Sequence, residues 1–208
     1  MNKQFLAAGA MVCSLVLGSQ PTLAAKGFDY TYGEAAFRYS DSDVETGQGF
    51  LVGFSYGATD MIHIDGRYSR MWINDWVGTS DADLNKDEFK LGIGGHFSVS
   101  DNVDLLATLR YVDEQLTGSV IRNGETFRRN INDDAEGYEL EVAGRIMFGK
   151  ELEITPHASY LDVGPGDDSG FGLGLVYKLD RNFSLLGDIS YYSDDSETGI
   201  FAGLRLNM

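Results

Sequence analysis

The sequence predicts an all-β protein, a closed antiparallel transmembrane β-barrel of ten strands, with eight strands as the alternative. Three observations predict it: the chain begins like an exported protein, about ten stretches have apolar residues at every second position, and no later apolar run reaches 18 residues. Period-two alternation gives a strand one apolar and one polar face. We therefore expect the apolar faces to meet lipid and the polar faces to line the barrel.

Residues 1–24 read as a secretory signal peptide. Lys3 supplies a positive charge, residues 5–17 form an apolar core, and Ala24 ends a small-residue cleavage site, with cleavage after Ala25 as the alternative. The apolar core is shorter than the roughly 20 residues that a membrane-spanning helix needs. We expect residues 25–208 to form one barrel domain in the outer membrane. The one cysteine, Cys13, lies in the signal, so we expect no disulfide.

The composition is acidic, with 16 Lys and Arg residues against 32 Asp and Glu residues and a formal net charge of −16 at pH 7. Nucleic-acid binding requires a basic surface, so this class of function is excluded. The 26 glycines and the 12% aromatic content fit closely packed strands and aromatic belts at the membrane interfaces. A mean hydropathy of −0.19 fits a barrel because only alternate residues face lipid.

The first three strands are predicted at 28–40, 47–57 and 61–75. Each has an apolar stripe with polar or small residues between, and Gly57–Asp60 reads as a tight turn. The predicted lipid-facing residues are Ala35, Phe37, Tyr39, Phe50, Val52, Phe54, Tyr56, Ile62, Ile64 and Tyr68.

The fourth strand is predicted at 87–99, the fifth begins near Val103, and the sixth ends near Phe148. Between the last two, Asn123-Gly124 lies among strand-like residues, which predicts a type I′ turn at the tip of a protruding hairpin over 113–135. The predicted lipid-facing residues are Phe89, Leu91, Ile93, Phe97, Val99, Leu105, Ala107, Leu109, Tyr111, Tyr138, Leu140, Val142 and Ile146.

The last four strands are predicted at 152–161, 169–179, 183–193 and 199–208. Pro156 falls on the lipid face and lacks an N–H donor, which predicts a bulge. The predicted lipid-facing residues are Leu152, Ile154, Ala158, Tyr160, Phe171, Leu173, Leu175, Tyr177, Phe183, Leu185, Ile189, Tyr191, Ile200, Ala202, Leu204, Leu206 and Met208.

The predicted connections alternate in length. Short turns on the periplasmic side and longer loops on the external side are typical of outer-membrane barrels. Tight turns are expected near 58, 101, 150 and 181, and longer acidic loops at 40–47, 76–87, 113–135, 162–168 and 193–197.

In these features the chain resembles the small bacterial outer-membrane barrels of the porin family. The resemblance rests on residues 30–37, on 170–175 with Tyr177, and on the 180–183 turn. The last strand is similar to the assembly signal of such proteins, although Met208 stands where that signal usually has Phe. The resemblance implies a barrel that is not an enzyme. It also implies two partners: outer-membrane lipid with lipopolysaccharide, and the barrel insertion machinery, which reads the C-terminal strand. We expect a monomer.

The inward positions carry many charges of both signs. A small barrel has a lumen little wider than its side chains, so buried charges must pair or hold water. Two main interpretations stay open, an ion-paired plug and a narrow pathway for ions or small solutes, with a specific ligand site as a third. Lys90, Glu153 and Lys178 share this parity, and the candidate lumen charge network comprises Glu34, Arg38, Asp65, Arg67, Arg110, Glu139, Glu141, Arg145, Asp188 and Arg205.

Three other groups of residues give weaker indications of a functional site. His63, His96 and His157 share the inward parity, and we expect lumen hydrogen bonds there and neither metal nor cofactor. No serine lies in a nucleophile elbow, so we expect no catalytic residues. Arg122, Arg128 and Arg129 form a basic external cluster, able to contact lipid phosphates or simply to keep the surface soluble.

The sequence therefore predicts an outer-membrane barrel with a porin-like or envelope-structural role and a narrow, charge-filled lumen. The alternative is a cell-surface interaction or adhesion protein that acts through its acidic external loops and the 113–135 hairpin.

Overall fold

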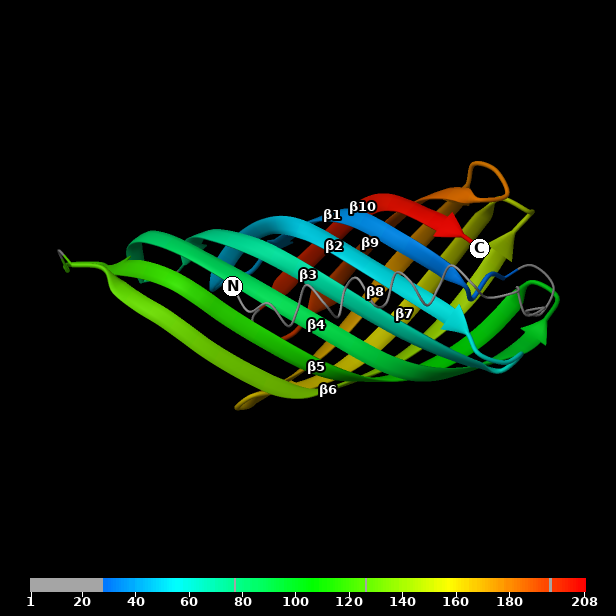
Figure 1. Cartoon of the computed structure of the whole chain (residues 1–208), viewed down its shortest axis with the longest axis horizontal. Coiled ribbons are helices and arrows are strands. Elements are labelled where there is room, and N and C mark those ends of the chain that lie inside the picture. The colour runs from blue at the N-terminus through cyan, green and yellow to red at the C-terminus, as the bar shows by residue number, and fades with distance from the viewer. Residues whose placement is uncertain (1–27, 77, 126, 195) are drawn as a thin grey trace.

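The computed structural model describes residues 28–208 except 77, 126 and 195. The described residues form ten antiparallel strands, each paired with its sequence neighbours, and β1 pairs with β10 to close the barrel (Figure 1). The predicted ten-stranded barrel is confirmed, and the eight-stranded alternative is wrong. The predicted signal peptide, residues 1–24, lies outside the described residues. No helix in the described part of the chain is long and apolar enough to span a membrane.

The strands are β1 (Tyr32–Asp41), β2 (Glu45–Gly57), β3 (Ile62–Trp76), β4 (Thr79–Ser100), β5 (Val103–Arg122), β6 (Arg129–Phe148), β7 (Leu152–Val163), β8 (Gly166–Lys178), β9 (Phe183–Tyr192) and β10 (Glu197–Asn207).

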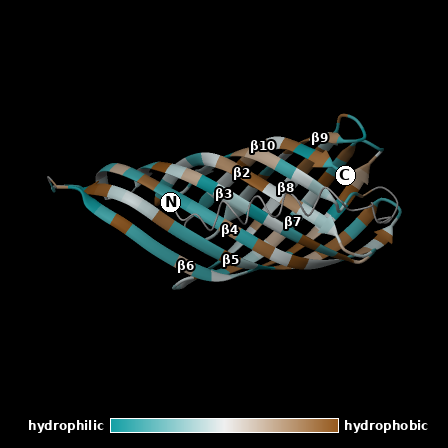
Figure 2. Cartoon of the chain, in the orientation of Figure 1, coloured by the Kyte–Doolittle hydropathy of each residue, from teal (hydrophilic) through white to brown (hydrophobic). Residues whose placement is uncertain are grey.

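The outer face of the barrel is apolar, as the alternation predicts. Leu109 is 53% exposed and Phe171 is 64% exposed, whereas the inward Arg110 is 2% exposed. Figure 2 shows the resulting alternation of hydropathy along the strands. An exposed apolar surface of this extent is costly in water and favourable in lipid.

The connections are short at both ends, which corrects the sequence prediction of long loops. The predicted loop at 76–87 is mostly strand, since β4 has 22 residues, whereas the predicted hairpin over 113–135 is confirmed and is formed by the ends of β5 and β6, 20 residues each. β1 and β9 have only 10 residues each. The wall is therefore much taller at β4–β6, and the β5–β6 hairpin projects from one end, at the left of Figure 1. We call this the hairpin end and the opposite end the short-turn end.

The tall part of the wall has the opposite hydropathy pattern from the rest. Ile73, Ala82, Leu84 and Val120 are buried on its inner face, at most 4% exposed, and Leu116 packs against them. The residues alternating with them on β4 and β5, such as 81, 83, 117 and 119, are acidic or polar. This inversion is expected where a strand leaves lipid, because its outer face then meets water.

The hairpin tip departs from the predicted turn type. The N–H of Glu125 donates to the carbonyl of Arg122 at 3.0 Å, so Asn123 and Gly124 are the central residues. Only Gly124 has a positive φ, +84°. This is the φ pattern of a type II turn, because a type I′ turn needs positive φ at both central residues.

Two other local predictions are wrong. Pro156 makes no bulge: the β6–β7 register is the same on both sides of it, and only two bridge pairs are missing, between Ala143↔His157 and Ile146↔Ile154. The first strand begins at Tyr32 and not at Phe28. Residues 28–31 leave the sheet because their polar and aromatic groups are held by side chains inside the barrel.

Candidate functional site: the charged lumen

Arg110 is the centre of the polar lumen. Its guanidinium pairs with Asp65 at 2.7 Å, with Glu141 at 3.2 Å and with Glu139. Asp65 comes from β3, Arg110 from β5, and both glutamates from β6. Arg110, Asp65 and Glu139 are all at most 5% exposed. Three carboxylates therefore converge on one buried cation.

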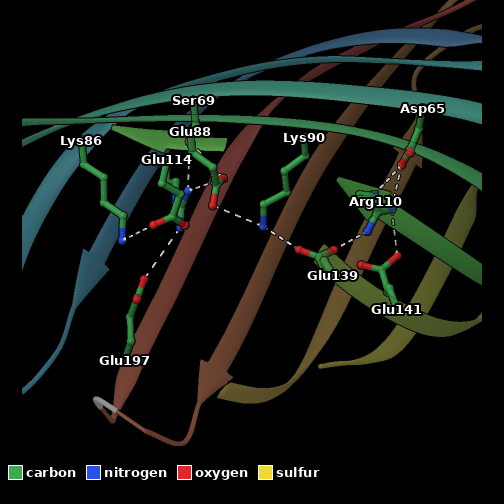
Figure 3. Close-up of polar contacts among 11 residues, drawn as sticks. Asp65, Ser69, Lys86, Glu88, Lys90, Arg110, Glu114, Glu139, Glu141 and Glu197 are labelled. Atoms are coloured by element: carbon green, nitrogen blue, oxygen red, sulfur yellow. Dashed lines mark hydrogen bonds and ion pairs between the residues drawn. The ribbon is translucent and has the colours of Figure 1, made fainter. Parts of the chain in front are cut away.

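The ion pairs continue along the lumen from this cluster. Lys90 Nζ lies 2.5 Å from Glu139 and 3.2 Å from Glu88 (Figure 3). Glu88 also pairs with Arg38 at 3.4 Å, and Arg38 lies 3.7 Å from Glu197. We define the central cluster as Asp65, Glu88, Lys90, Arg110, Glu139 and Glu141. It alternates in sign, so each charge has an opposite neighbour.

The remaining candidate residues form three separate groups. Glu34 lies 3.8 Å from Arg67 and 3.2 Å from Arg205. Arg145 makes a two-pronged bond to Glu153, with both distances 2.7 Å. The His157 ring lies 2.9 Å from Asp188. Arg110 is thus the candidate arginine that pairs with Asp65, Glu139 and Glu141, while Asp188 has a histidine partner.

Glycines make several of these contacts possible across an intervening strand. In the register, Gly92 lies between Asp65 and Arg110, and Gly53 lies between Glu34 and Arg67. A Cβ at Gly92 would lie 2.5 Å from Arg110 Cγ and 2.8 Å from Asp65 Oδ1. Residues two strands apart can meet only because the residue between them has no side chain.

The inward histidines do not converge on one point. His63 and His96 lie at the short-turn end with ring centroids 5.7 Å apart, and the Tyr30 ring stacks on His96 at 3.6 Å. His157 lies apart from them, against Asp188. Within the described residues, no three His, Cys, Asp or Glu side chains are placed to hold a metal ion.

Two of the three external arginines form ion pairs within the chain. Arg128 pairs with Asp81, and Arg129 pairs with Glu125 at 2.8 Å. Arg129 also lies over the Phe127 ring, 5.5 Å from its centroid, and Phe127 is 58% exposed. The hairpin tip therefore presents an aromatic ring beside partly neutralised arginines.

The lumen ion pairs also involve residues outside the candidate network, among them Lys90, Glu88, Glu153 and Glu197, together with Lys86 and Glu114, which lie 3.7 Å apart. Lys90 and Glu153 share the inward parity, and Glu88 lies two residues before Lys90 on the same face. Parity places Lys90 and Glu153 inward in the sequence analysis, and the same rule could have found Glu88. Glu197 is the first residue of β10, in a stretch read as a loop, so its direction could not be inferred.

The fold is that of solved outer-membrane barrels. The β domain of the Bordetella autotransporter BrkA is 11% identical, with a TM-score of 0.54 over 86% of this chain and 100% of that chain. OprG from Pseudomonas aeruginosa is 10% identical, with a TM-score of 0.51 over 88% of this chain and 98% of that chain. The porin NanC is 7% identical, with a TM-score of 0.51 over 85% of this chain and 100% of that chain.

These likenesses show the fold: the chain forms a closed β-barrel of the kind found in small outer-membrane proteins, and its outer face is apolar. At such identities the likeness shows the fold alone. No protein-family model matches the chain, and no curated protein matches it in sequence.

Proposed function

We propose that this barrel has an envelope-structural role in the outer membrane, with a lumen that its own ion pairs keep closed to solutes. The observation that carries the proposal is Arg110, 2% exposed and bonded to Asp65, Glu139 and Glu141 from two other strands. A water-filled pathway would leave such a group solvated. Ion pairs that join strands across the lumen instead make the barrel rigid.

The orientation follows from the class. We place the short-turn end at the periplasm and the hairpin end outside the cell, as in outer-membrane barrels generally. The outward residues of β10, including Ile200, Leu204 and Leu206, are 42–52% exposed, which suits recognition by the insertion machinery and contact with lipid and lipopolysaccharide. The predicted signal peptide directs export.

Single-channel recording in planar bilayers tests the closed lumen. We expect purified wild-type protein to give no steady openings, because the ion pairs of the central cluster join side chains from β3, β4, β5 and β6 inside the lumen. Replacing Arg110 by Met should produce small leaks, because the freed carboxylates then require water. Steady openings from wild-type protein would contradict the closed lumen and establish a porin. Such a pore should prefer cations, because acidic residues near its ends raise the local cation concentration.

A second candidate function is surface interaction through the projecting hairpin. The exposed Phe127 beside Arg129 favours it, since aromatic and arginine side chains dominate binding energy at protein interfaces. Adherence and autoaggregation of cells carrying wild-type protein would be compared with those of cells carrying Phe127→Ser. Equal values at equal surface expression would exclude this role for the tip.

A further inference from the structure

The segment just before β1 lies inside the short-turn end of the barrel. Phe28, Tyr30 and Thr31 are 2%, 4% and 9% exposed. Residues 28–31 belong to no strand, although β1 follows directly at Tyr32. A short segment outside the sheet is ordered and buried to this degree only where specific contacts hold it.

Tyr30 is held from several sides. Its hydroxyl donates to Asp104 Oδ2 at 2.8 Å, and its ring stacks on His96 with an interplanar angle of 12°. The Ser55 hydroxyl donates to the Tyr30 carbonyl at 2.8 Å. Asp104 is 0% exposed, and its other oxygen accepts from Ser98 at 2.7 Å. Removal of Tyr30 would leave a fully buried carboxylate one donor short, which is costly.

Arg145 joins this segment to the wall. While its guanidinium binds Glu153, Nη1 donates to the Asp29 carbonyl at 3.1 Å. The same guanidinium lies over the rings of Tyr30 and Phe28, at 4.6 and 5.0 Å from their centroids. A desolvated cation–π contact of this kind is favourable, so one arginine clamps three consecutive residues.

The outer parts of the segment are held as well. Phe28 packs with Met147 and Leu106 from β6 and β5. Asp29 lies 3.4 Å from Lys178 Nζ on β8. Contacts therefore come from inward side chains of β2, β4, β5, β6 and β8, and the segment crosses the lumen instead of following one wall.

We propose that residues 28–31 form a stopper that closes the short-turn mouth of the barrel. The stopper is a second barrier in series with the central cluster, and it shares no residue with that cluster. Any solute entering from the periplasm would have to break the Tyr30–Asp104 bond and displace two aromatic rings from Arg145. With cleavage after Ala24, as the sequence predicts, the stopper lies at the beginning of the mature chain.

A thiol reporter beneath the stopper tests this proposal. Ser55→Cys places a thiol directly under the Tyr30 backbone, at a side chain that is 2% exposed. Arg181→Cys, in the exposed β8–β9 turn, is the matched reporter outside the lumen. A membrane-impermeant maleimide would be added to detergent-solubilised protein. We expect the Ser55→Cys reporter to react at least about tenfold more slowly, because only locally opened molecules react.

The same reporter in a Phe28→Ala/Tyr30→Ala background should react at a rate near that of Arg181→Cys. Phe127→Ala, which removes a ring at the other end, should leave it slow. Fast labelling in the otherwise wild-type chain would overturn the proposal, and so would slow labelling after both alanine substitutions. Should that double variant fail to fold, nuclear Overhauser contacts between the Tyr30 and His96 rings of wild-type protein decide: their presence supports the stopper and their absence overturns it. The labelling reports on this mouth alone, so its outcome is independent of the conductance test.

Discussion

Arg110 on β5 and Glu139 on β6 are directly opposite each other in the strand register, and their side chains form an ion pair inside the lumen. Asp65 reaches the same arginine from β3, across Gly92 of β4. The central cluster is thus built from cross-strand neighbours in one row, with a glycine where a side chain would separate them. Its integrity depends as much on that glycine as on the charges.

Replacing Arg110 by Met should lower the free energy of unfolding by about 3–5 kcal/mol, because it leaves buried carboxylates without their cation. Urea-induced unfolding in detergent, followed by heat-modifiable gel migration, measures the change. Arg122→Met, at an exposed position near the hairpin tip, is the control and should have almost no effect. An equal decrease in the free energy of unfolding for the two variants would show that the buried ion pairs of Arg110 do not stabilise the barrel.

Gly92→Ala should be destabilising by about 1–3 kcal/mol, because its Cβ would overlap Arg110 and Asp65 in a packed interior. Gly95→Ala on the same strand is the matched control: it faces outward, and the nearest atom to its added Cβ is 3.8 Å away. The same unfolding assay compares them. If the two alanine variants have the same free energy of unfolding, the absence of a side chain at Gly92 is not needed for the contact between Asp65 and Arg110.

Leu175→Arg should cost about 2–4 kcal/mol, because it places a cation near the middle of the bilayer. Leu179→Arg, in the β8–β9 turn, makes the same change at the membrane edge and should cost about 0–1 kcal/mol. Both leucines are exposed on the outer face. Unfolding in lipid vesicles measures the difference, and a Leu175→Arg variant as stable as wild type would disprove the lipid-facing assignment of β8.

Shortening the hairpin tip should leave the barrel folded, whereas disrupting the buried apolar cluster around Val120 should destabilise the hairpin end. Replacing residues 123–128 by Asn-Gly removes no buried residue of that cluster. Val120→Asp places a charge at a side chain that is 2% exposed beside Leu84 and Ile73. Hydrogen exchange of β4 and β5 should rise at their hairpin ends only for Val120→Asp. Deletion of 119–130 would also remove Val120 and should raise exchange in the same way.

The β8–β9 turn should confer pH-dependent stability. The backbone N–H groups of Phe183 and Asn182 donate to the Asp180 carboxylate at 2.8 Å, which lowers its pKa. A lowered folded-state pKa stabilises the protein above the normal pKa of Asp, and this contribution is lost as the pH falls through the lowered value. Asp180→Ala should therefore be less stable than wild type at pH 7, and the difference should disappear in strong acid. A difference that persists there would assign the effect to packing.

The sequence by itself determined the strands that cross the membrane. Leu105, Leu109 and Tyr111 alternate with Asp104, Thr108 and Arg110, and a sheet with lipid on one side and a polar interior on the other satisfies this pattern. The inward parity of the charges follows from the same alternation. Beyond the membrane the apolar residues turn inward, as Leu84 and Val120 do, so acidic strand ends were read as loops.

Only the tertiary structure decided which charges pair and where the chain before β1 lies. Alternation gives the face of a residue, but pairing depends on the register of nonadjacent strands, as with Asp65 and Arg110 across Gly92. Phe28 and Tyr30 alternate with polar residues, so the sequence predicted them as strand, although they share the inward parity of Glu34 and not the apolar stripe of Phe37. They lie across the lumen because Asp104 and Arg145, distant in the sequence, form a buried site there that a strand-bound Tyr30 could not reach.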